Sequence, residues 1–144
     1  MDDTEDSRES VKLIEHFDLF SQQDLVGIML IQGGKVVHAN RMIAESLDMA
    51  VENIIGADIE NFLKYIRSDQ RGFVREQIRK KESGEEDDVI SRYIFESKTP
   101  RGKTIWVELY SRTVEYRGST ADLVVMLDIT DRKQAEDALR ASEE

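Results

Sequence analysis

The chain contains no cysteine, and this absence removes several kinds of chemistry at once. Without a thiol there is no disulfide framework, no thiolate zinc site, no cysteine nucleophile and no photochemistry that attaches a flavin to cysteine. Histidine is scarce as well, because only His16 and His38 occur. Two histidines argue against an all-histidine metal site, so the function of the chain must rest on other side chains.

The sequence also lacks long apolar runs, and its basic residues are outnumbered by acidic ones. No apolar run approaches the roughly 18 residues that a membrane-spanning helix needs, and the acidic N-terminus lacks the apolar stretch of a signal peptide. The chain has 20 basic and 30 acidic residues, a net charge of −10, which disfavours contact with nucleic acid or an anionic membrane. We therefore predict a soluble, cytoplasmic domain, which leaves open a membrane-anchored parent protein.

What the chain does have is the composition of one globular domain. Of its 144 residues, 40% are hydrophobic and 35% are charged, enough for a sizeable core beneath a charged surface. Two candidate catalytic or metal motifs fail on inspection. Gly33-Gly34-Lys35 lacks the first glycine and the final hydroxyl of a phosphate-binding loop. The acidic run 85–88 lacks the alternating ligands and the glycine of a calcium loop, and we predict no enzymatic activity for the chain itself.

The first half of the chain alternates between helical and extended patterns. Apolar residues spaced by three predict an amphipathic helix over about residues 8–23. Two apolar runs, around 25–31 and 36–38, are joined by a glycine turn and predict a β-hairpin. Asn40 is then a good N-cap for a short helix, and two further short segments follow before residue 67.

The second half begins with a longer helix and is then dominated by strands. The pattern predicts a helix over about 69–83, capped by Ser68 or Asp69 and ended by Gly84. Thr130 begins a last helix. The strand-like segments between these helices are 89–95, 104–116 and 122–129. Because turns link successive strands, we predict an antiparallel sheet with helices on one side, an α+β fold.

The order and spacing of four passages of the sequence indicate a known family. They are 25–40, with its Ala39-Asn40 helix start; 53–56; 102–108, around Trp106; and 127–136, which contains Asp128-Ile129-Thr130. Together they resemble the PAS (Per-Arnt-Sim) sensory domain family over about residues 22–144, and the Asp-Ile-Thr passage is the most specific. The resemblance implies a five-stranded antiparallel sheet in the order 2-1-5-4-3, with helices over one face and a pocket between sheet and helices. Asp48 stands where the family often has glycine, and aspartate can adopt the left-handed conformation needed there.

The resemblance also divides the chain and suggests where a ligand would bind. Residues 1–23 would be an acidic tail and flanking helix, 24–130 the PAS core and 131–144 an outgoing linker helix. The candidates to line the ligand pocket are Ile28, Leu30, Asn40, Ile43, Leu47, Tyr93, Phe95, Val107, Leu109 and Ser111. Further interior candidates include Val125 and Leu127. Whether the pocket is open or filled by side chains stays open at this point.

The resemblance bears on cofactors too. In haem-binding PAS relatives the axial ligand usually comes from the long helix before the third strand, and residues 69–83 contain no histidine. We therefore predict a colourless protein without haem and without covalent flavin. A non-covalent flavin stays possible, because it needs only stacking and hydrogen bonds.

The Asp-Ile-Thr junction is expected to carry the signal out of the domain. Thr130 should cap the outgoing helix, and Asp128 should pair with Arg132 or Lys133 and so fix the angle at which the helix leaves the sheet. An exposed pair of little energetic weight is the alternative. The helix itself has only a narrow apolar seam, which favours pairing with a second copy or continuation into a downstream effector domain.

These observations predict a non-catalytic sensory module of a larger signalling protein, such as a histidine kinase. It would detect a small ligand or the state of a partner and pass the change to a downstream effector. The alternative is a ligand-free dimerisation and interaction module that uses the helix at 8–23 and the outer sheet face with Trp106 and Tyr110. Under both interpretations we expect a homodimer without direct contact to nucleic acid or membrane. Any phosphoacceptor or kinase elements would lie outside this chain.

Overall fold

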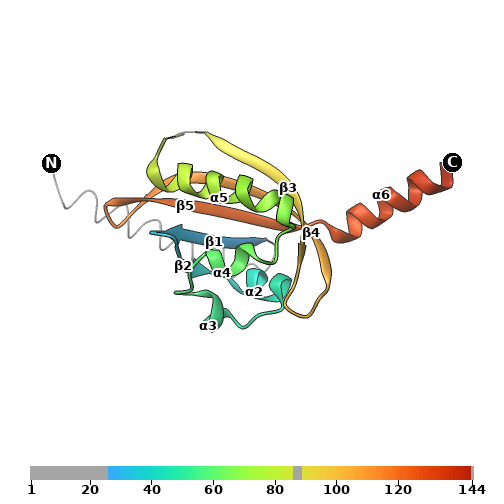
Figure 1. The fold of residues 1–144 in the computed structure, drawn as a ribbon, viewed down its shortest axis with the longest axis horizontal. Coiled ribbons are helices and arrows are strands. Elements are labelled where there is room, and N and C mark those ends of the chain that lie inside the picture. The colour runs from blue at the N-terminus through green and yellow to red at the C-terminus, as the bar shows by residue number, and fades with distance from the viewer. Residues whose placement is uncertain (1–25, 86–88, 144) are drawn as a thin grey trace.

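A single antiparallel sheet organises the molecule. The computed structural model describes residues 26–85 and 89–143, so the helix predicted at 8–23 lies outside the described residues. The sheet has the strand order β2-β1-β5-β4-β3, which confirms the predicted fold and topology. The strands are β1 Gly27–Gln32, β2 Lys35–Ala39, β3 Ile90–Lys98, β4 Thr104–Tyr116 and β5 Ser119–Asp128 (Figure 1).

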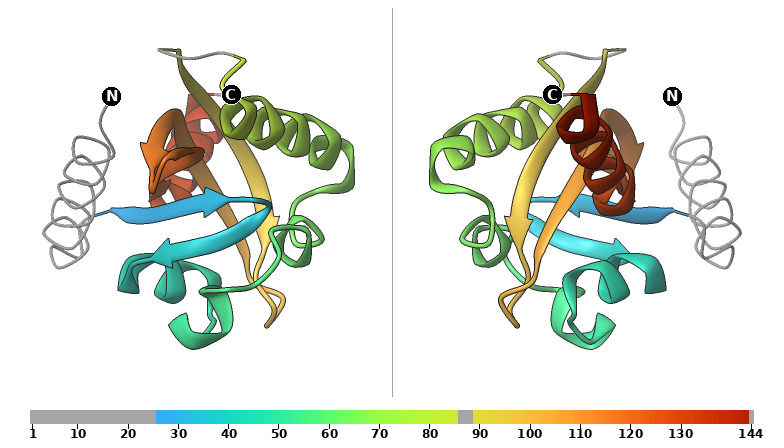
Figure 2. Two further views of the ribbon diagram at one scale, coloured as in Figure 1. Left: turned by 90° about the vertical axis from the view of Figure 1, so that its left-hand side faces the viewer. Right: turned by 90° about the vertical axis from the view of Figure 1, so that its right-hand side faces the viewer.

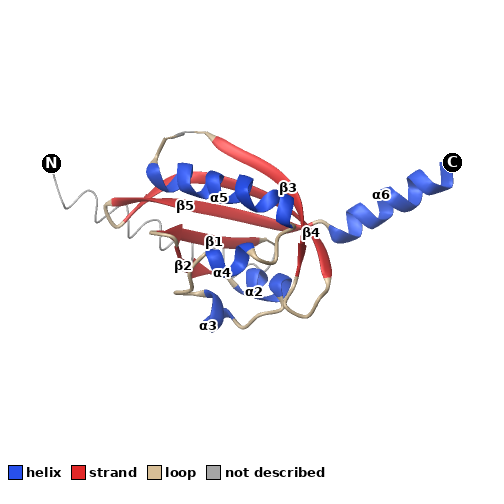
Figure 3. Cartoon of the chain, viewed as in Figure 1, coloured by secondary structure: helices blue, strands red, loops and turns tan. Residues whose placement is uncertain are grey.

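Four of the described helices connect β2 to β3, and one follows β5. They are α2 Arg41–Leu47, α3 Val51–Ile54, α4 Glu60–Leu63, α5 Ser68–Ser83 and α6 Thr130–Glu143. The first four contribute side chains to one core cluster with the inner face of the sheet. The last, α6, projects away from the core and buries none of its residues (Figures 1 and 3). Figure 2 shows the twisted sheet and its covering helices from the two ends.

Asn40 joins the first hairpin to the first described helix. Its side-chain oxygen accepts hydrogen bonds from the backbone N–H of Ile43 (3.2 Å) and of Ile28 (3.0 Å), and its amide donates to the carbonyl of Val26 (2.8 Å). The predicted N-cap is therefore confirmed. At the other end of α2, Asp48 has φ of 56°, the left-handed conformation expected at this position.

The start of α5 differs from the prediction. Neither Ser68 nor Asp69 caps it: the capping position is Arg67, which makes no side-chain cap hydrogen bond. The Asp69 carboxylate instead accepts from Nε of Arg67 at 2.7 Å. The preceding backbone pairs with the edge of β3, where the N–H of Arg67 donates to the carbonyl of Glu96 at 3.3 Å. Pairing with a distant strand thus directs the chain into α5, whereas the end of the helix at Gly84, with φ of 77°, agrees with the sequence.

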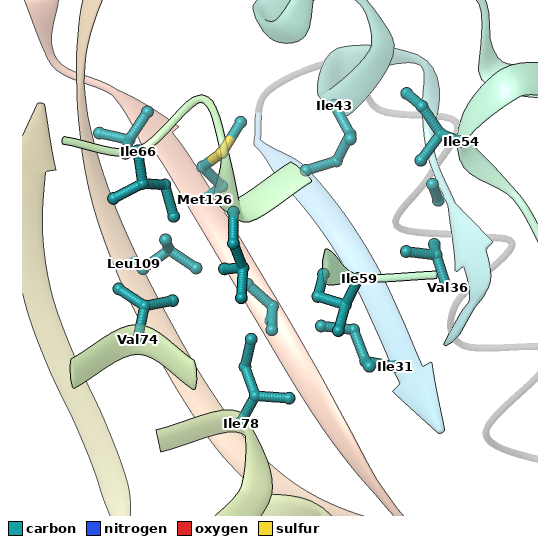
Figure 4. Packing of buried hydrophobic residues seen from close by; sticks show 14 of the residues in the cluster. Ile31, Val36, Ile43, Ile54, Ile59, Ile66, Val74, Ile78, Leu109 and Met126 are labelled. Atoms are coloured by element: carbon teal, nitrogen blue, oxygen red, sulfur yellow. The ribbon is translucent and has the colours of Figure 1, made fainter. Parts of the chain in front are cut away.

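The sheet buries side chains on both of its faces. The inner cluster joins strand residues such as Ile31, Leu109 and Met126 to Val74 and Ile78 of α5, and Figure 4 shows these side chains pointing toward one another. A smaller outer cluster consists of Ile28, Leu30, Tyr116 and Ala121. Neighbouring strand residues point to opposite faces, so each strand of this sheet supplies apolar side chains in both directions.

Candidate functional site

An apolar cavity lies between the inner face of the sheet and the helices α2, α4 and α5. Its volume is about 80 Å³, and roughly 10–15 Å³ of such space accommodates one water molecule. The cavity could therefore hold a few waters or one small organic molecule. Its lining is almost wholly aliphatic and aromatic, with Tyr65, Tyr93 and Ser97 as the residues that carry side-chain hydroxyls.

Six of the ten predicted pocket residues line this cavity. They are Ile43, Leu47, Tyr93, Phe95, Val107 and Leu109. They come from α2, β3 and β4, elements that are far apart in the chain and that the fold brings around one space. That these residues contact a ligand stays a prediction.

Two predicted pocket residues on β1 lie on the wrong face. Ile28 and Leu30 belong to the outer cluster, and their neighbours Met29 and Ile31 line the cavity instead. Because side chains alternate along a strand, an error of one residue moves the whole set to the other face. The run from Ile28 to Ile31 is apolar throughout, so its pattern does not indicate which residues face inward.

The same correction applies to β5. The predicted interior residues were Val125 and Leu127, but Val124 and Met126 line the cavity. The strand pairing explains the assignment, because Leu109 of β4 lies opposite Met126 and shares its face. The sequence of β5 gave no help with this choice. Asp122 shares the face of Val124, and a charged residue normally suggests that its face is exposed to solvent.

Two of the three polar candidates, Asn40 and Ser111, lie outside the cavity lining. Asn40 caps α2 and holds β1, as described above. Ser111 lies beyond the cavity on the same inner face and donates its hydroxyl to Oδ1 of Asp122 at 2.5 Å. Both side chains are buried, but their hydrogen bonds are made within the fold.

Sequence reasoning missed a buried polar cluster at this end of the sheet. We use the name Asp122 cluster for Lys81, Ser111, Thr113 and Asp122, all of which are buried. Burial raises the pKa of the Asp122 carboxyl group to about 7; the Ser111 hydrogen bond opposes this shift, the charge of Glu82 adds to it and that of Lys81 opposes it. Nothing in the local pattern marks Lys81 as buried, because the end of α5 is rich in charged residues.

Tyr93 connects the cavity with the Asp122 cluster. It lines the cavity, and its ring packs against Phe95 (5.9 Å between centroids) and edge-on against Phe73 (5.5 Å). Burial raises the pKa of its hydroxyl, and the charge of Asp122 adds to this shift. Tyr93 is therefore neutral at physiological pH, and it interacts electrostatically with the nearby Asp122.

The junction between β5 and α6 is held by a short chain of hydrogen bonds. Oδ1 of Asp128 accepts from the backbone N–H of Thr130 (3.0 Å) and from its hydroxyl (2.5 Å). The Thr130 hydroxyl oxygen in turn accepts from the backbone N–H of Trp106 (3.0 Å). The N–H of Ile129 donates to the carbonyl of Trp106 (2.8 Å), so the start of α6 is fastened to β4.

The predicted ion pair at this junction is wrong. Arg132 lies 3.7 Å from Glu136 on its own helix, and the ammonium of Lys133 lies 4.9 Å from the centre of the Trp106 ring. The carboxylate of Asp128 is used by Thr130 instead. Thr130 therefore links Asp128 to Trp106, whereas sequence reasoning had expected a charge pair with Asp128 to fix the angle of the helix.

Two general properties complete the description of residues 26–85 and 89–143. They contain no group of three or more histidine, cysteine, aspartate or glutamate residues arranged to hold a metal ion. No helix in these segments combines the length and the apolar character needed to cross a membrane.

Comparison with known proteins agrees with this architecture. The PAS domain of an HTR-like protein from Haloarcula marismortui has 18% identity and a TM-score of 0.61, with 85% of this chain and 99% of that one covered. A sensory box histidine kinase/response regulator from Burkholderia thailandensis has 19% identity and a TM-score of 0.61, with 88% and 94% covered. A PAS domain of a LuxR-family transcriptional regulator from the same organism, in complex with ethanol, has 17% identity and a TM-score of 0.59, with 78% and 96% covered. These likenesses concern the fold.

Sequence comparison extends the likeness from fold to family. No match was found among curated proteins. The PAS domain family, however, matches residues 25–131, which include the whole sheet and the junction with α6. The chain therefore belongs to the PAS domain family.

Proposed function

We propose that this PAS domain is a non-catalytic sensory module that holds a small, largely apolar molecule in its inner cavity and passes the change to a downstream effector through α6. The observation that carries the proposal is the cavity itself, which lies between sheet and helices and is lined almost entirely by apolar groups. Apolar cavities of this kind favour small apolar ligands. The PAS domain in complex with ethanol offers a precedent of suitable size.

The strands supply a path from the cavity to α6. Val107 lines the cavity, and the side chain of its neighbour Trp106 points to the other face, where Lys133 lies over its ring. The backbone N–H of Trp106 donates to the hydroxyl oxygen of Thr130. On β5, Met126 lines the cavity two residues before Asp128. A ligand that shifts either strand would therefore alter the hydrogen bonds that hold the start of α6. Such a switch requires the ligand to bind the two arrangements with different affinity.

The test combines native mass spectrometry of the purified chain with tryptophan fluorescence. Trp106 is the only tryptophan in the sequence and reports on the junction. We expect a small co-purifying molecule, or binding of added short-chain alcohols, together with a change in Trp106 emission. Val124→Ile should weaken binding by adding a methyl group to the cavity. Val125→Ile is the matched control, because this neighbouring residue faces the other side of the sheet.

Three results would contradict the proposal. One is the absence of any bound or binding small molecule. Another is binding that Val124→Ile and Val125→Ile affect equally, because the ligand would then sit elsewhere. A third is binding that leaves Trp106 emission unchanged, because the cavity and the junction would then be uncoupled.

A second candidate function is a ligand-free interaction module, and the observation that favours it is the exposure of α6. None of the residues of this 14-residue helix is buried, and Leu139 is 62% exposed. A short helix with so little contact is marginal by itself, so it fits pairing with a second copy or continuation into an effector domain. Sedimentation that shows a dimer which Leu139→Glu weakens, without any cavity ligand, would favour this candidate.

A further inference from the structure

Beyond the cavity, the inner face of the sheet ends in the Asp122 cluster. Asp122 and Lys81 are completely buried, and Ser111 is only 1% exposed. Aspartate and lysine are almost never fully buried unless they are paired, because removing a charge from water is costly. A buried carboxyl group and a buried ammonium group in one cluster therefore call for a physical explanation that packing does not supply.

The hydrogen bonds of Asp122 suit a neutral carboxyl group better than a carboxylate. Oδ1 accepts one hydrogen bond from Ser111, at 2.5 Å, and Oδ2 is buried without any partner. The Lys81 ammonium donates to the backbone carbonyl of Val89, at 2.7 Å, just before β3. An ionised carboxylate with one hydroxyl donor would lack the hydrogen bonds it requires.

The groups around Asp122 come from every element that packs against it. Among the described residues these are Lys81 and Glu82 on α5, Tyr93 on β3, Ser111 and Thr113 on β4, and Ile31 on β1. One cation and one anion oppose each other, and the remaining groups are neutral or apolar. Burial therefore dominates, and it raises the pKa of Asp122 to about 7, where small changes of pH alter its charge.

The Asp122 cluster lies where the last turn of α5 is attached to the sheet. The hydroxyl of Thr113 donates to the carbonyl of Lys81 at 2.7 Å, and that of Thr120 donates to the carbonyl of Glu82. The Glu82 carboxylate accepts from the N–H of Gly34, at 3.0 Å, in the first hairpin. The end of α5 is thus held to three parts of the sheet by polar contacts beside the buried carboxyl group.

We propose that Asp122 is a proton-binding sensory site whose charge state controls how the last turn of α5 is held against the sheet. When Asp122 is neutral, the Lys81 ammonium donates to Val89 as observed. When Asp122 releases its proton to solvent, the carboxylate attracts the ammonium away from that carbonyl and toward β5. The attachment of α5 to the start of β3 then changes.

This change would also reach the cavity. Val74 and Ile78 of α5 form part of the cavity wall, and Ile78 lies one turn before Lys81. A shift of the last turn of α5 would alter the shape of the cavity and hence its affinity for a ligand. In this respect the inference rests on the proposed sensory function, because it makes the proton a second input to the same site.

The direct test is an NMR titration of side-chain carboxyl carbons in the whole chain, from about pH 5 to about pH 9. The Asp122 signal is assigned by its loss in Asp122→Asn, and Asp137→Asn, at an exposed position on α6, is the matched control. We expect Asp122 to titrate near pH 7, about three pH units above ordinary aspartate. The backbone amides of Lys81 and Val89 should shift with the same midpoint, and Asp122→Asn should abolish that shift.

Two further variants keep the test decisive if Asp122→Asn fails to fold. Ser111→Ala removes the hydroxyl that stabilises the ionised carboxylate, and Lys81→Met removes the nearby cation. Both changes should move the midpoint of the Asp122 titration to higher pH. A midpoint that either variant lowers would contradict the assigned surroundings of the carboxyl group.

The inference is overturned if Asp122 titrates in the ordinary range of aspartate, or if the Val89 amide shows no transition at the Asp122 midpoint. Failure of the proposed function would look different. Trp106 emission would then ignore added ligand while the carboxyl titration and the Val89 transition were still observed. The two results are measured on different residues and are therefore distinguishable.

Discussion

The strand β5 carries an aspartate at each end of its inner face, and the two have opposite environments. Asp122 is completely buried, with one oxygen bonded to Ser111 and the other without a partner. Asp128 is exposed, and its Oδ1 receives two hydrogen bonds from Thr130. The alternation of side chains puts both on the same face, so strand phase does not explain the difference.

What separates the two ends is the helix that covers them. The last turn of α5 lies over the Asp122 end, where Lys81 and Glu82 are bonded to Thr113 and Thr120. At the Asp128 end, the chain leaves the sheet and begins α6, which projects into solvent (Figure 1). The comparison teaches that one end of β5 holds a buried carboxyl group that can change its charge, and that the other end sets the direction of a helix.

The largest expected effect concerns the pH dependence of stability. A carboxyl group whose folded-state pKa is raised, as for Asp122, stabilises the fold fully below its unfolded pKa, and this stabilisation is lost as the pH rises through about 7. Between about pH 5 and pH 8 the free energy of unfolding should fall by roughly 2–3 kcal/mol, because each unit of pKa shift corresponds to about 1.4 kcal/mol. Urea denaturation at a series of pH values measures this slope.

Two variants decide whether the slope belongs to Asp122. Asp122→Asn should remove most of it, whereas Asp128→Asn should leave it unchanged. The window begins above pH 5 because exposed carboxylates with lowered pKa values, such as Glu60 beside Arg75, act in the opposite direction at lower pH. Equal slopes in all three proteins would remove the contrast between the two ends of β5.

Asn40 offers a sharper version of the comparison, since it is buried like Asp122 but makes three hydrogen bonds. Asn40→Ala should lower the free energy of unfolding by about 2–3 kcal/mol, because it removes a helix cap and leaves the N–H of Ile28 buried without a partner. Chemical denaturation measures the loss. Asn61→Ala, at an exposed position in α4, should cost less than about 0.5 kcal/mol, and a similar cost for both would contradict this role of Asn40.

The junction at the other end of β5 should respond more weakly. Thr130→Val removes the acceptor for the N–H of Trp106 and the donor to Asp128, and should cost about 1–2 kcal/mol. It should also change Trp106 emission, while Thr130→Ser, which keeps the hydroxyl, should behave like the unmodified protein. Identical behaviour of the two variants would mean that the hydroxyl has no part in the junction.

The smallest effect is expected for Arg132. Its pair with Glu136 is exposed and lies within one helix, so Arg132→Ala should change the free energy of unfolding by less than about 0.5 kcal/mol. Thermal and urea denaturation at pH values on both sides of 7 provide the measurement. A cost above about 1.5 kcal/mol exceeds what an exposed pair normally contributes. Such a cost would favour the predicted pair with Asp128 again.

Much of the fold was predictable because its signals are local. The glycine turn of the first hairpin, the Asn40 cap, the left-handed Asp48 and the end of α5 at Gly84 each depend on a few consecutive residues. The strand order followed from the resemblance to PAS domains and is confirmed. Four of the six cavity-lining residues on β3 and β4 were identified, where charged residues such as Arg92, Glu96 and Glu108 mark the opposite face.

The sequence by itself thus determined the order of the elements, their turns and the family, because caps, turns and periodicity act between neighbours in the chain. The tertiary structure alone decided which face Ile28 and Leu30 occupy, that β3 rather than a side-chain cap holds the start of α5, and that Lys81 and Asp122 are buried together. Each of these depends on contacts between residues remote in sequence. An apolar run can face either way until a helix covers one side of it, and a charged side chain is exposed or buried according to what packs over it.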